Sequence, residues 1–277
     1  MKMAKVSLII PVHNAAGSIG ACLDAVLAQS LDALETILVD DHGQDDSIAR
    51  AKQHLASYNG PKQFMFIATA ANAGPGAARN CGIEAASGRF IAFLDSDDTL
   101  APDFCQRLFE AATRAEADMA CGAISFDLPD GTSAIRRNPP VRDGAFEGKA
   151  KRAYLRRFKS YFTTCLYSRS LLVDNGIRFP DTRSAEDSCF LTCCLLAARR
   201  IAGDDGAIYH YAIHPASTSQ RKDPARYRNR LASFRALIAF AKAKGLYKPY
   251  RGTLRLLVLK KGYLLAAKDY LTNNLFK

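Results

Sequence analysis

The chain lacks an uninterrupted apolar segment long enough to cross a bilayer. The apolar run over residues 6–12 is also too short for the core of a signal peptide followed by a cleavage site. Internal repeats and low-complexity tracts are absent. The 8 cysteines show no paired C-x-x-C spacing, which argues against a structural zinc site and against a disulfide framework. We therefore expect a cytoplasmic protein whose thiols are buried and reduced.

Acidic residues are scarce in the second half of the chain. Residues 1–130 contain 9 Lys and Arg against 17 Asp and Glu, whereas residues 131–277 contain 29 against 10. This division predicts an acidic first half that can hold a metal ion, and a basic second half that meets an anionic partner. A diphosphate, a nucleic acid and an anionic membrane surface all have this chemistry. At 277 residues, the chain is long enough for one or two domains with a full core.

Short apolar runs alternate with amphipathic segments over the first 100 residues. We expect strands over residues 6–10, 36–39, 64–68 and 90–94, and helices over residues 16–29, 47–56 and 77–86. Pro11 is expected to stop the first strand. Because strand and helix alternate four times, the sequence predicts an α/β fold with a doubly wound, mostly parallel central sheet and flanking helices.

The pattern is less regular beyond residue 100. We expect helices over residues 102–116 and 186–198, strands over 119–126, 161–167 and 207–213, a turn at 129–132, and a loop over 138–148 that covers the site. From Pro224 onward the chain is expected to be helical, with a break over residues 245–249.

Three carboxylates, Asp95, Asp97 and Asp98, follow the apolar run over residues 90–94. Like charges repel, so this crowding is favourable where a divalent cation neutralises them. Mg²⁺ and Mn²⁺ prefer carboxylate oxygens and leave positions for phosphate oxygens. The carboxyl edge of a parallel sheet is where open α/β folds bind ligands, so this segment predicts a metal–diphosphate site. The alternative is a polar turn in which Asp98 or Thr99 caps a helix that begins at Pro102.

Four segments combine in a specific order and spacing. They are Pro11-Val12-His13-Asn14, Val39-Asp40-Asp41-His42-Gly43-Gln44-Asp45, Asn72-Ala73-Gly74-Pro75-Gly76-Ala77-Ala78-Arg79-Asn80-Cys81-Gly82 and Asp95-Ser96-Asp97-Asp98. Together they resemble family 2 glycosyltransferases of the GT-A fold, closely over residues 1–100 and again at Ala185-Glu186-Asp187. The resemblance implies an inverting transfer of a sugar from a nucleotide-diphosphate sugar, with UDP as the expected nucleotide, to a hydroxyl acceptor.

The resemblance also implies which residues bind the nucleotide. Asp41, or its neighbour Asp40, would accept the imide N–H of a uracil; the alternative is an acid that caps a helix. The full set is Pro11, Asn14, Asp40, Asp41, Asn72, Gly74, Arg79, Asp95 and Ser96. Gly74 and Gly76 would let the backbone approach the ligand closely. Arg79 would face the nucleotide or, alternatively, form a salt bridge. Many relatives have a Glu where this chain has Ala16, so one contact to the nucleotide is missing.

The metal and the catalytic base are likewise carried over from the resemblance. Asp97 would bind Mn²⁺ or Mg²⁺, with Asp95 closer to the ribose or the sugar. His214 would reach the metal or the diphosphate. Asp187, beside Glu186 at the start of a helix, would accept the proton of the acceptor hydroxyl. Because a helix N-terminus lowers the pKa of a carboxylate, the alternative for Asp187 is simple complementation of the helix dipole.

The sequence divides into residues 1–220, a catalytic domain with a nucleotide-binding half (1–100) and an acceptor-binding half (101–220), and residues 221–277, a basic helical extension. Apolar residues and one lysine recur at helical spacing in this extension, namely Leu254, Leu257, Val258, Lys261 and Leu265. Such a helix either lies on anionic lipid at the inner membrane face or packs on the catalytic domain. The resemblance implies a carbohydrate or lipid-linked acceptor in bacterial surface polysaccharide or glycolipid synthesis.

The sequence leaves two other functions open. A nucleotidyltransferase also uses an α/β sheet and acidic metal ligands, but it needs a Gly-rich, basic loop after the first strand, which residues 14–17 do not provide. The second alternative is a non-catalytic basic module that binds a nucleotide or a membrane surface. The sequence has no nucleic-acid motif with interleaved aromatic residues, so no nucleic-acid partner is expected. The donor sugar, the acceptor and the oligomeric state are not determined by the sequence.

Overall fold

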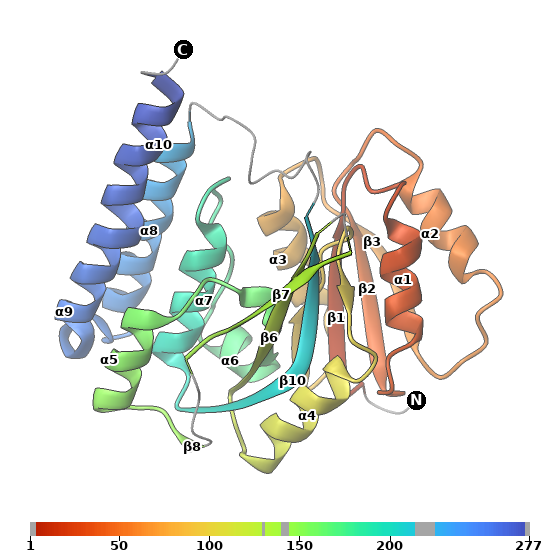
Figure 1. Cartoon of the computed structure of the whole chain (residues 1–277), viewed down its shortest axis with the longest axis horizontal. Helices are drawn as coiled ribbons and strands as arrows, with labels where there is room; N and C mark the ends of the chain where they lie inside the picture. The colour runs from red at the N-terminus through yellow and green to blue at the C-terminus, as the bar shows by residue number, and fades with distance from the viewer. Residues whose placement is uncertain (1–3, 129–130, 140–143, 214–224, 275–277) are drawn as a thin grey trace.

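The computed structural model describes residues 4–128, 131–139, 144–213 and 225–274 (Figure 1). For residues 271–274 it describes the backbone alone. Ten strands within these residues form one sheet. They are β1 (Val6–Val12), β2 (Leu34–Asp40), β3 (Gln63–Ala68), β4 (Phe90–Phe93), β5 (Thr99–Leu100), β6 (Met119–Asp127), β7 (Ser133–Arg137), β8 (Gly144–Ala145), β9 (Cys165–Ser168) and β10 (Arg200–Ala212).

The helices of the described residues follow the strands in the alternating order that the sequence predicts over its first 100 residues. They are α1 (Ile19–Leu27), α2 (Ser47–Leu55), α3 (Pro75–Ala85), α4 (Phe104–Arg114), α5 (Gly148–Arg157), the 3₁₀ turn η1 (Phe162–Thr164), α6 (Arg169–Asp174), α7 (Glu186–Ala197), α8 (Arg226–Ala243), α9 (Tyr247–Leu257), the π-helix η3 (Val258–Leu264) and α10 (Leu265–Asn274).

The strand order is β3-β2-β1-β4-β9-β6-β10-β5, with β7 paired to β6 and β8 paired to β10. Strands β1 to β4 run parallel to one another, and β6 runs parallel to β10. The short strand β9 lies antiparallel between β4 and β6, so both of these strands point the same way. The carboxyl ends of six strands therefore meet at one edge of the sheet, which is the edge where ligands bind in such folds.

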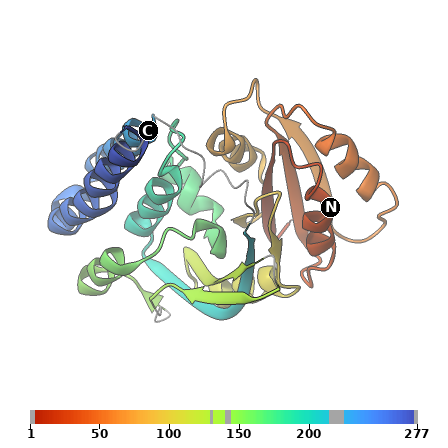
Figure 2. The ribbon, with the colours of Figure 1, turned by 45° about the horizontal axis from the view of Figure 1, so that its top comes forward.

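Side chains on the central strands alternate between two hydrophobic cores. Leu8 and Ile10 of β1 pack with α1, α2 and α4 on one face, whereas Ile9 between them packs with α3, α5 and α7 on the other. All three are fully buried, because helices cover both faces of the sheet (Figure 2). The expected doubly wound arrangement is confirmed.

The first strand continues through Pro11, contrary to expectation. Leu94 N–H donates to Ile9 O on the β4 side, and Asp41 N–H donates to Val12 O on the β2 side. The backbone nitrogen of Pro11 therefore points toward the β4 side, but the pairing of β1 with β4 ends at Ile9. Its missing N–H leaves no strand partner unsatisfied, so a proline is tolerated inside β1.

The second half of the sheet also differs in detail from the sequence interpretation. Strand β10 begins at Arg200 instead of 207, because its pairing with β6 continues across an irregularity between Gly203 and Ile208. The irregularity contains Gly203, Asp204, Asp205 and Gly206, which are residue types that are rare in strands, so the sequence pattern does not predict a strand there. The segment expected as a loop over 138–148 contains β8 and leads directly into α5.

The C-terminal helices share a core with the sheet. Leu254 and Leu257 of α9 are buried in the same cluster as Ile9, and Val258 packs against that cluster. These residues therefore pack on the catalytic domain, which is one of the two alternatives for this segment. Leu265, by contrast, is 40% exposed. The chain division at residue 220 stays a prediction.

No helix in the described part of the chain has both the length and the apolar character needed to cross a bilayer.

Candidate active site

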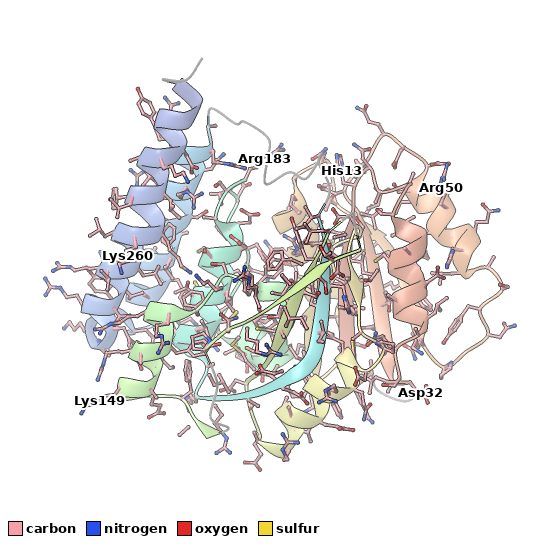
Figure 3. The ribbon with its side chains drawn as sticks, in the orientation of Figure 1. His13, Asp32, Arg50, Lys149, Arg183 and Lys260 are labelled. Atoms are coloured by element: carbon pink, nitrogen blue, oxygen red, sulfur yellow. The ribbon has the colours of Figure 1, made fainter. Side chains whose placement is uncertain are left out.

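The carboxyl edge of the sheet gathers most of the residues that the sequence marks as functional. Figure 3 labels His13 after β1 and Arg183 before α7, which lie at the same edge of the molecule. Asp41 follows β2, the loop with Asn72 and Gly74 follows β3, and Asp95 follows β4. His214, the expected second metal ligand, lies outside the described residues.

Asp41 is buried and holds the loop that leads into α3. Its Oδ1 accepts the Thr69 hydroxyl and the Ala73 N–H, both at 3.1 Å, and its Oδ2 accepts the Gly74 N–H at 2.9 Å. Gly74 has φ +88°, a conformation that favours glycine, and this turn exposes Asn72 at the loop tip. Asp41 therefore fixes the glycine-rich loop instead of capping the helix that follows β2.

Gly76 serves packing in this structure. A Cβ at this position would lie 3.3 Å from the Cβ of Phe179, so the glycine lets α3 approach the segment before α7. This contact is to protein, whereas the sequence interpretation assigned the close approach to a ligand.

The turn after β1 is tied to the turn after β2. Asn14 adopts φ +52°, and its Oδ1 accepts the Gln44 N–H at 2.7 Å. His13 Nδ1 lies 3.1 Å from the carbonyl oxygen of Asp41. Asp40 is half-buried and accepts the His42 N–H at 2.9 Å. Because His13 and Asn14 are exposed, these turns form an open rim beside the carboxylates of β2.

Ala16, at the place of the acid that many relatives carry, is tied through its backbone to the β2–α2 turn. Asp45 accepts the Ala16 N–H at 2.9 Å and the Ser47 N–H at 3.1 Å. Partial desolvation would raise the pKa of Asp45, but these hydrogen bonds, the Ser47 hydroxyl and the charge of Arg50 lower it overall. Asp45 therefore holds the start of α2 and the turn after β1 together.

Arg79 forms an ion pair with Asp95 inside the site. Its Nη2 lies 2.6 Å from Asp95 Oδ1, and the two side chains are only 7% and 29% exposed. The guanidinium is 4.8 Å from the ring centre of Phe162 and 5.3 Å from that of Phe179, so two aromatic rings hold it. Burial would lower the pKa of Arg79, but Asp95 and Glu186 raise it. Arg79 is thus a fixed cation between β4 and α7.

The three carboxylates after β4 have three different environments. Asp97 is exposed, Asp95 is half-buried, and Asp98 is buried. Asp98 accepts the Tyr209 hydroxyl at 2.6 Å and the Ala212 N–H at 2.9 Å, which ties this loop to β10. Burial, together with the charge of Asp95, raises the pKa of Asp98 to about 8. The helix-capping interpretation of Asp98 is wrong, because α4 begins after Asp103 and Asp98 is bound to β10.

Tyr209 is a site residue that sequence analysis missed. Its hydroxyl donates to Asp98 and also accepts the Asp95 N–H at 3.2 Å, so it orients both ends of the carboxylate loop. The alternation of tyrosines at 209 and 211 is the only local signal, and it does not reveal a partner more than 100 residues away.

The donors at this loop fit a hard divalent cation that also binds phosphate. Asp95 and Asp97 flank Ser96 and present carboxylate oxygens at the open edge, whereas Asp98 is engaged with β10. The described residues contain no cluster of three or more His, Cys, Asp or Glu side chains able to hold a metal. Mg²⁺ commonly binds through one or two carboxylates together with substrate phosphates, and this donor set matches that mode.

Asp187 and Glu186 begin α7, directly after Ala185, which has the left-handed φ of +60°. Asp187 Oδ1 accepts the Ser188 N–H at 2.6 Å. Desolvation raises the pKa of Asp187, although the Ser188 N–H and the charges of Arg79, Lys261 and Arg230 oppose this. The helix N-terminus was expected to lower that pKa, and burial outweighs it.

Helix α8 supports the turn that carries these acids. Ser233 is fully buried, and its hydroxyl donates to the carbonyl oxygen of Ser184 at 2.8 Å. The C-terminal helices therefore take part in building the site, which no local sequence signal indicates.

The chain matches known proteins over most of its length. A model of the family described as Glycosyl transferase family 2 matches residues 7–174. The putative glycosyltransferase EpsH of Bacillus subtilis (strain 168) is 30% identical over 258 residues, which cover 92% of this chain and 74% of EpsH. The succinoglycan biosynthesis protein ExoO of Rhizobium meliloti (strain 1021) is 31% identical, over 79% of this chain and 64% of ExoO.

Solved structures share the fold at lower identity. TarS of S. aureus (1–349) in complex with UDP-GlcNAc has a TM-score of 0.72 and 19% identity, covering 97% of this chain and 79% of that one. The mannosyltransferase PcManGT from Pyrobaculum calidifontis, in complex with GDP-Man and Mn²⁺, has a TM-score of 0.62 and 20% identity, covering 97% and 74%.

These matches decide between the three functions that the sequence left open. They favour the transferase over the nucleotidyltransferase and over the non-catalytic module. The chain therefore belongs to glycosyltransferase family 2, and it is an enzyme with the GT-A fold.

Proposed function

We propose that this enzyme transfers a sugar from a UDP-sugar to a hydroxyl acceptor, inverts the anomeric centre and depends on Mn²⁺ or Mg²⁺. The observation that carries the proposal is the position of Arg79. Its guanidinium pairs with Asp95 at the carboxylate loop and acts electrostatically on Glu186 and Asp187 at the start of α7. The expected metal loop and the expected base thus lie on two sides of one buried cation.

Asp187 is the group that accepts the proton in this proposal. The acceptor oxygen attacks the anomeric carbon while its proton passes to the Asp187 carboxylate, and the bond from that carbon to the diphosphate oxygen breaks. One in-line displacement of this kind inverts the centre and needs no covalent enzyme nucleophile. A carboxylate whose pKa is raised by burial is a stronger base, which suits this role.

Asp97, with Asp95 beside it, would hold the divalent cation, and His214 would add a ligand from beyond the described residues. When bound, the cation would neutralise the charge that develops on the departing diphosphate. Arg79 contributes a second, fixed positive charge. Its buried Nε has no hydrogen-bond partner among the described residues.

The nucleotide would bind along the rim formed by Pro11, Asn14 and the β2–α2 turn. Asp40 and Asp41 are the two candidates for the imide N–H of a uracil. Asp41 already holds the glycine-rich loop, whereas Asp40 is half-buried and accepts one backbone N–H. Asn72, Gly74 and Ser96 would contact the ribose and the diphosphate. TarS is described with UDP-GlcNAc and PcManGT with GDP-Man, so the base is the first point to test.

Isothermal titration of UDP, with and without Mn²⁺, tests this proposal. We expect UDP binding that strengthens with Mn²⁺ in the wild type, and loss of the Mn²⁺ effect in Asp97→Ala. Asp24→Asn is the matched control, because Asp24 is an exposed acid on α1 whose Oδ1 lies 2.8 Å from His54 Nε2. Binding of GDP but not UDP would contradict the assignment of the base. Absence of binding to either nucleotide would refute the donor class.

A lipid-linked acceptor at an anionic membrane surface is the further part of this proposal. Helical segments η3 and α10 expose large apolar side chains: Leu259 (50%), Tyr263 (57%), Leu264 (58%), Leu265 (40%) and Tyr270 (47%). Exposed basic residues, among them Arg255 and Lys268, accompany them. An apolar face with basic neighbours is typical of helices that lie in the interface of anionic membranes.

Sedimentation with phosphatidylglycerol vesicles at low salt tests the membrane surface. We expect wild-type protein to sediment with the vesicles and Leu259→Ser/Leu264→Ser to remain in solution. Met65→Ser is the control, because Met65 is a 40% exposed apolar residue on β3. If the wild-type protein does not bind at low salt, the membrane partner is excluded and the transferase proposal is unaffected.

A further inference from the structure

The π-helix η3 turns one of two adjacent lysines into the protein. Lys260 is exposed on the outer side of the C-terminal helices (Figure 3), whereas Lys261 is half-buried. Next to them, Gly262 is buried, and a Cβ there would lie 3.2 Å from the Phe234 ring of α8. Adjacent residues of a helix point in different directions, and the packing of Gly262 on α8 sets the Lys261 side of η3 toward the protein. Such π segments are often found at functional sites.

Lys261 is held by groups that lie close to the candidate base. Its Nζ donates to the carbonyl oxygen of Phe158 and to the hydroxyl of Ser160, both at 3.2 Å. It also lies 3.8 Å from the ring centre of Phe158. The Ser160 hydroxyl is hydrogen-bonded to the Ser188 hydroxyl. Since the Ser188 N–H donates to Asp187 Oδ1, two serines connect the lysine to Asp187.

The charge of Lys261 differs from the other positive charges that face Asp187. Arg79 from α3 pairs with Asp95, and Arg230 from α8 pairs with Asp269 at 2.7 Å. Lys261 from η3, by contrast, makes the two hydrogen bonds given above, and both of their acceptors are neutral oxygens. Among the described residues, Arg79 and Arg230 are each bonded to a carboxylate, whereas Lys261 is bonded only to neutral oxygens. Glu186, the neighbour of Asp187, adds negative charge on the same helix.

The electrostatic effects on the two groups are reciprocal. Burial, opposed by Asp187 and aided by Lys159, lowers the pKa of Lys261 to about 8. Burial raises the pKa of Asp187, and Lys261 opposes this. At neutral pH the lysine is therefore mostly charged, and each group stabilises the charged form of the other.

We propose that Lys261 is a positioning residue for the transfer reaction: from the π-helix it holds Ser160 and Ser188 in place and stabilises the negative charge of Asp187. This rests on the proposed role of Asp187 as the base. It makes the C-terminal helices part of the catalytic machinery, because the side chain that tunes the base comes from η3.

Carbon NMR of protein labelled at the aspartate Cγ tests this inference without a substrate. Asp187→Asn assigns the resonance of Asp187, and its titration midpoint is then compared between variants. In Lys261→Met we expect that midpoint to rise by about half to one pH unit, because a nearby positive charge is removed. Lys261→Arg keeps the charge, so its midpoint should stay close to that of the wild type. Lys260→Met is the matched control and should show no shift.

Ser160→Ala provides a second test that leaves both charged groups in place. It removes the hydrogen bond from Lys261, and we expect a smaller rise in the same midpoint. An unchanged midpoint in both Lys261→Met and Ser160→Ala would overturn the inference. The role of Asp187 fails separately: if Asp187→Asn keeps full transfer activity, Asp187 is not the base, whatever the titrations show.

Discussion

The ion pair between Arg79 and Asp95 gives the sharpest test of the site's structure. We consider Arg79→Met, which keeps a long apolar side chain between the rings of Phe162 and Phe179 but removes the charge. Without Arg79, the carboxylates of Asp95 and Glu186 lose the buried cation that faces them. The protein should therefore become less stable, even though the apolar packing of the side chain is largely kept.

The magnitude follows from the burial of the pair. Removing one partner of a buried ion pair costs about 3–5 kcal/mol, because the other charge is left uncompensated. Arg79 is 7% exposed and Asp95 is 29% exposed, so the remaining carboxylate keeps some contact with water. We therefore expect a loss near the lower end, about 3 kcal/mol. Arg79→Met/Asp95→Asn leaves no unpaired charge at this pair and should recover a substantial part of that loss.

Urea unfolding followed by circular dichroism measures these free energies. Arg50→Met is the matched control, since Arg50 and Asp46 form a pair that is 56% and 57% exposed. Exposed pairs on a helix contribute about 0.3–0.5 kcal/mol, so this control should barely move the midpoint. A loss below about 1 kcal/mol for Arg79→Met, or no recovery in the double variant, would refute the reasoning.

Three further predictions concern packing, a buried hydrogen bond and pH. Gly82→Ala should destabilise the protein by about 1–3 kcal/mol, because the alanine Cβ would lie 2.4 Å from Ile9 Cγ2. Thermal unfolding measures this loss of stability, and a loss smaller than the experimental error would contradict the close packing of α3 on β1. Tyr209→Phe should cost about 1–3 kcal/mol in urea unfolding, because Oδ2 of the buried Asp98 loses its hydrogen-bond donor at 2.6 Å. An unchanged midpoint would count against that bond. Burial lowers the pKa of Lys151 to about 8, below its value in the unfolded chain. The unfolded chain therefore binds more protons between pH 8 and pH 10, so stability relative to Lys151→Met should rise over this interval, and a parallel course of the two curves would contradict it.

The local sequence was sufficient for the alternating strands and helices from β1 to β4, although not for the end of β1 at Val12. Apolar runs of four to seven residues specify β1, β2 and β4, because only such runs can be buried on both faces of a sheet. Since the carboxyl ends of parallel strands meet at one edge, the positions of Asp41 and Asp95 followed from the strand assignment alone. The acids of residues 186–187 were found by their resemblance to a family motif.

Pairings between distant residues were beyond the sequence. A helix cap was the alternative interpretation of Asp98, because capping depends on neighbours in the chain, but Asp98 accepts a hydrogen bond from Tyr209 of β10, 111 residues away. The pKa of Asp187 was expected to fall at a helix N-terminus. It rises instead, because desolvation depends on what covers the group, and that cover comes from other elements.

The sequence by itself therefore determined the α/β order, the parallel half of the sheet and the acidic edge, because local periodicity and strand direction fix them. Tertiary structure alone decided which groups act together there. Arg79 pairs with Asp95 while two aromatic rings contact its guanidinium, and Lys261 is half-buried beside α8, on which Gly262 packs. Burial and long-range electrostatics set these partnerships, and both depend on surfaces that exist only once the chain has folded.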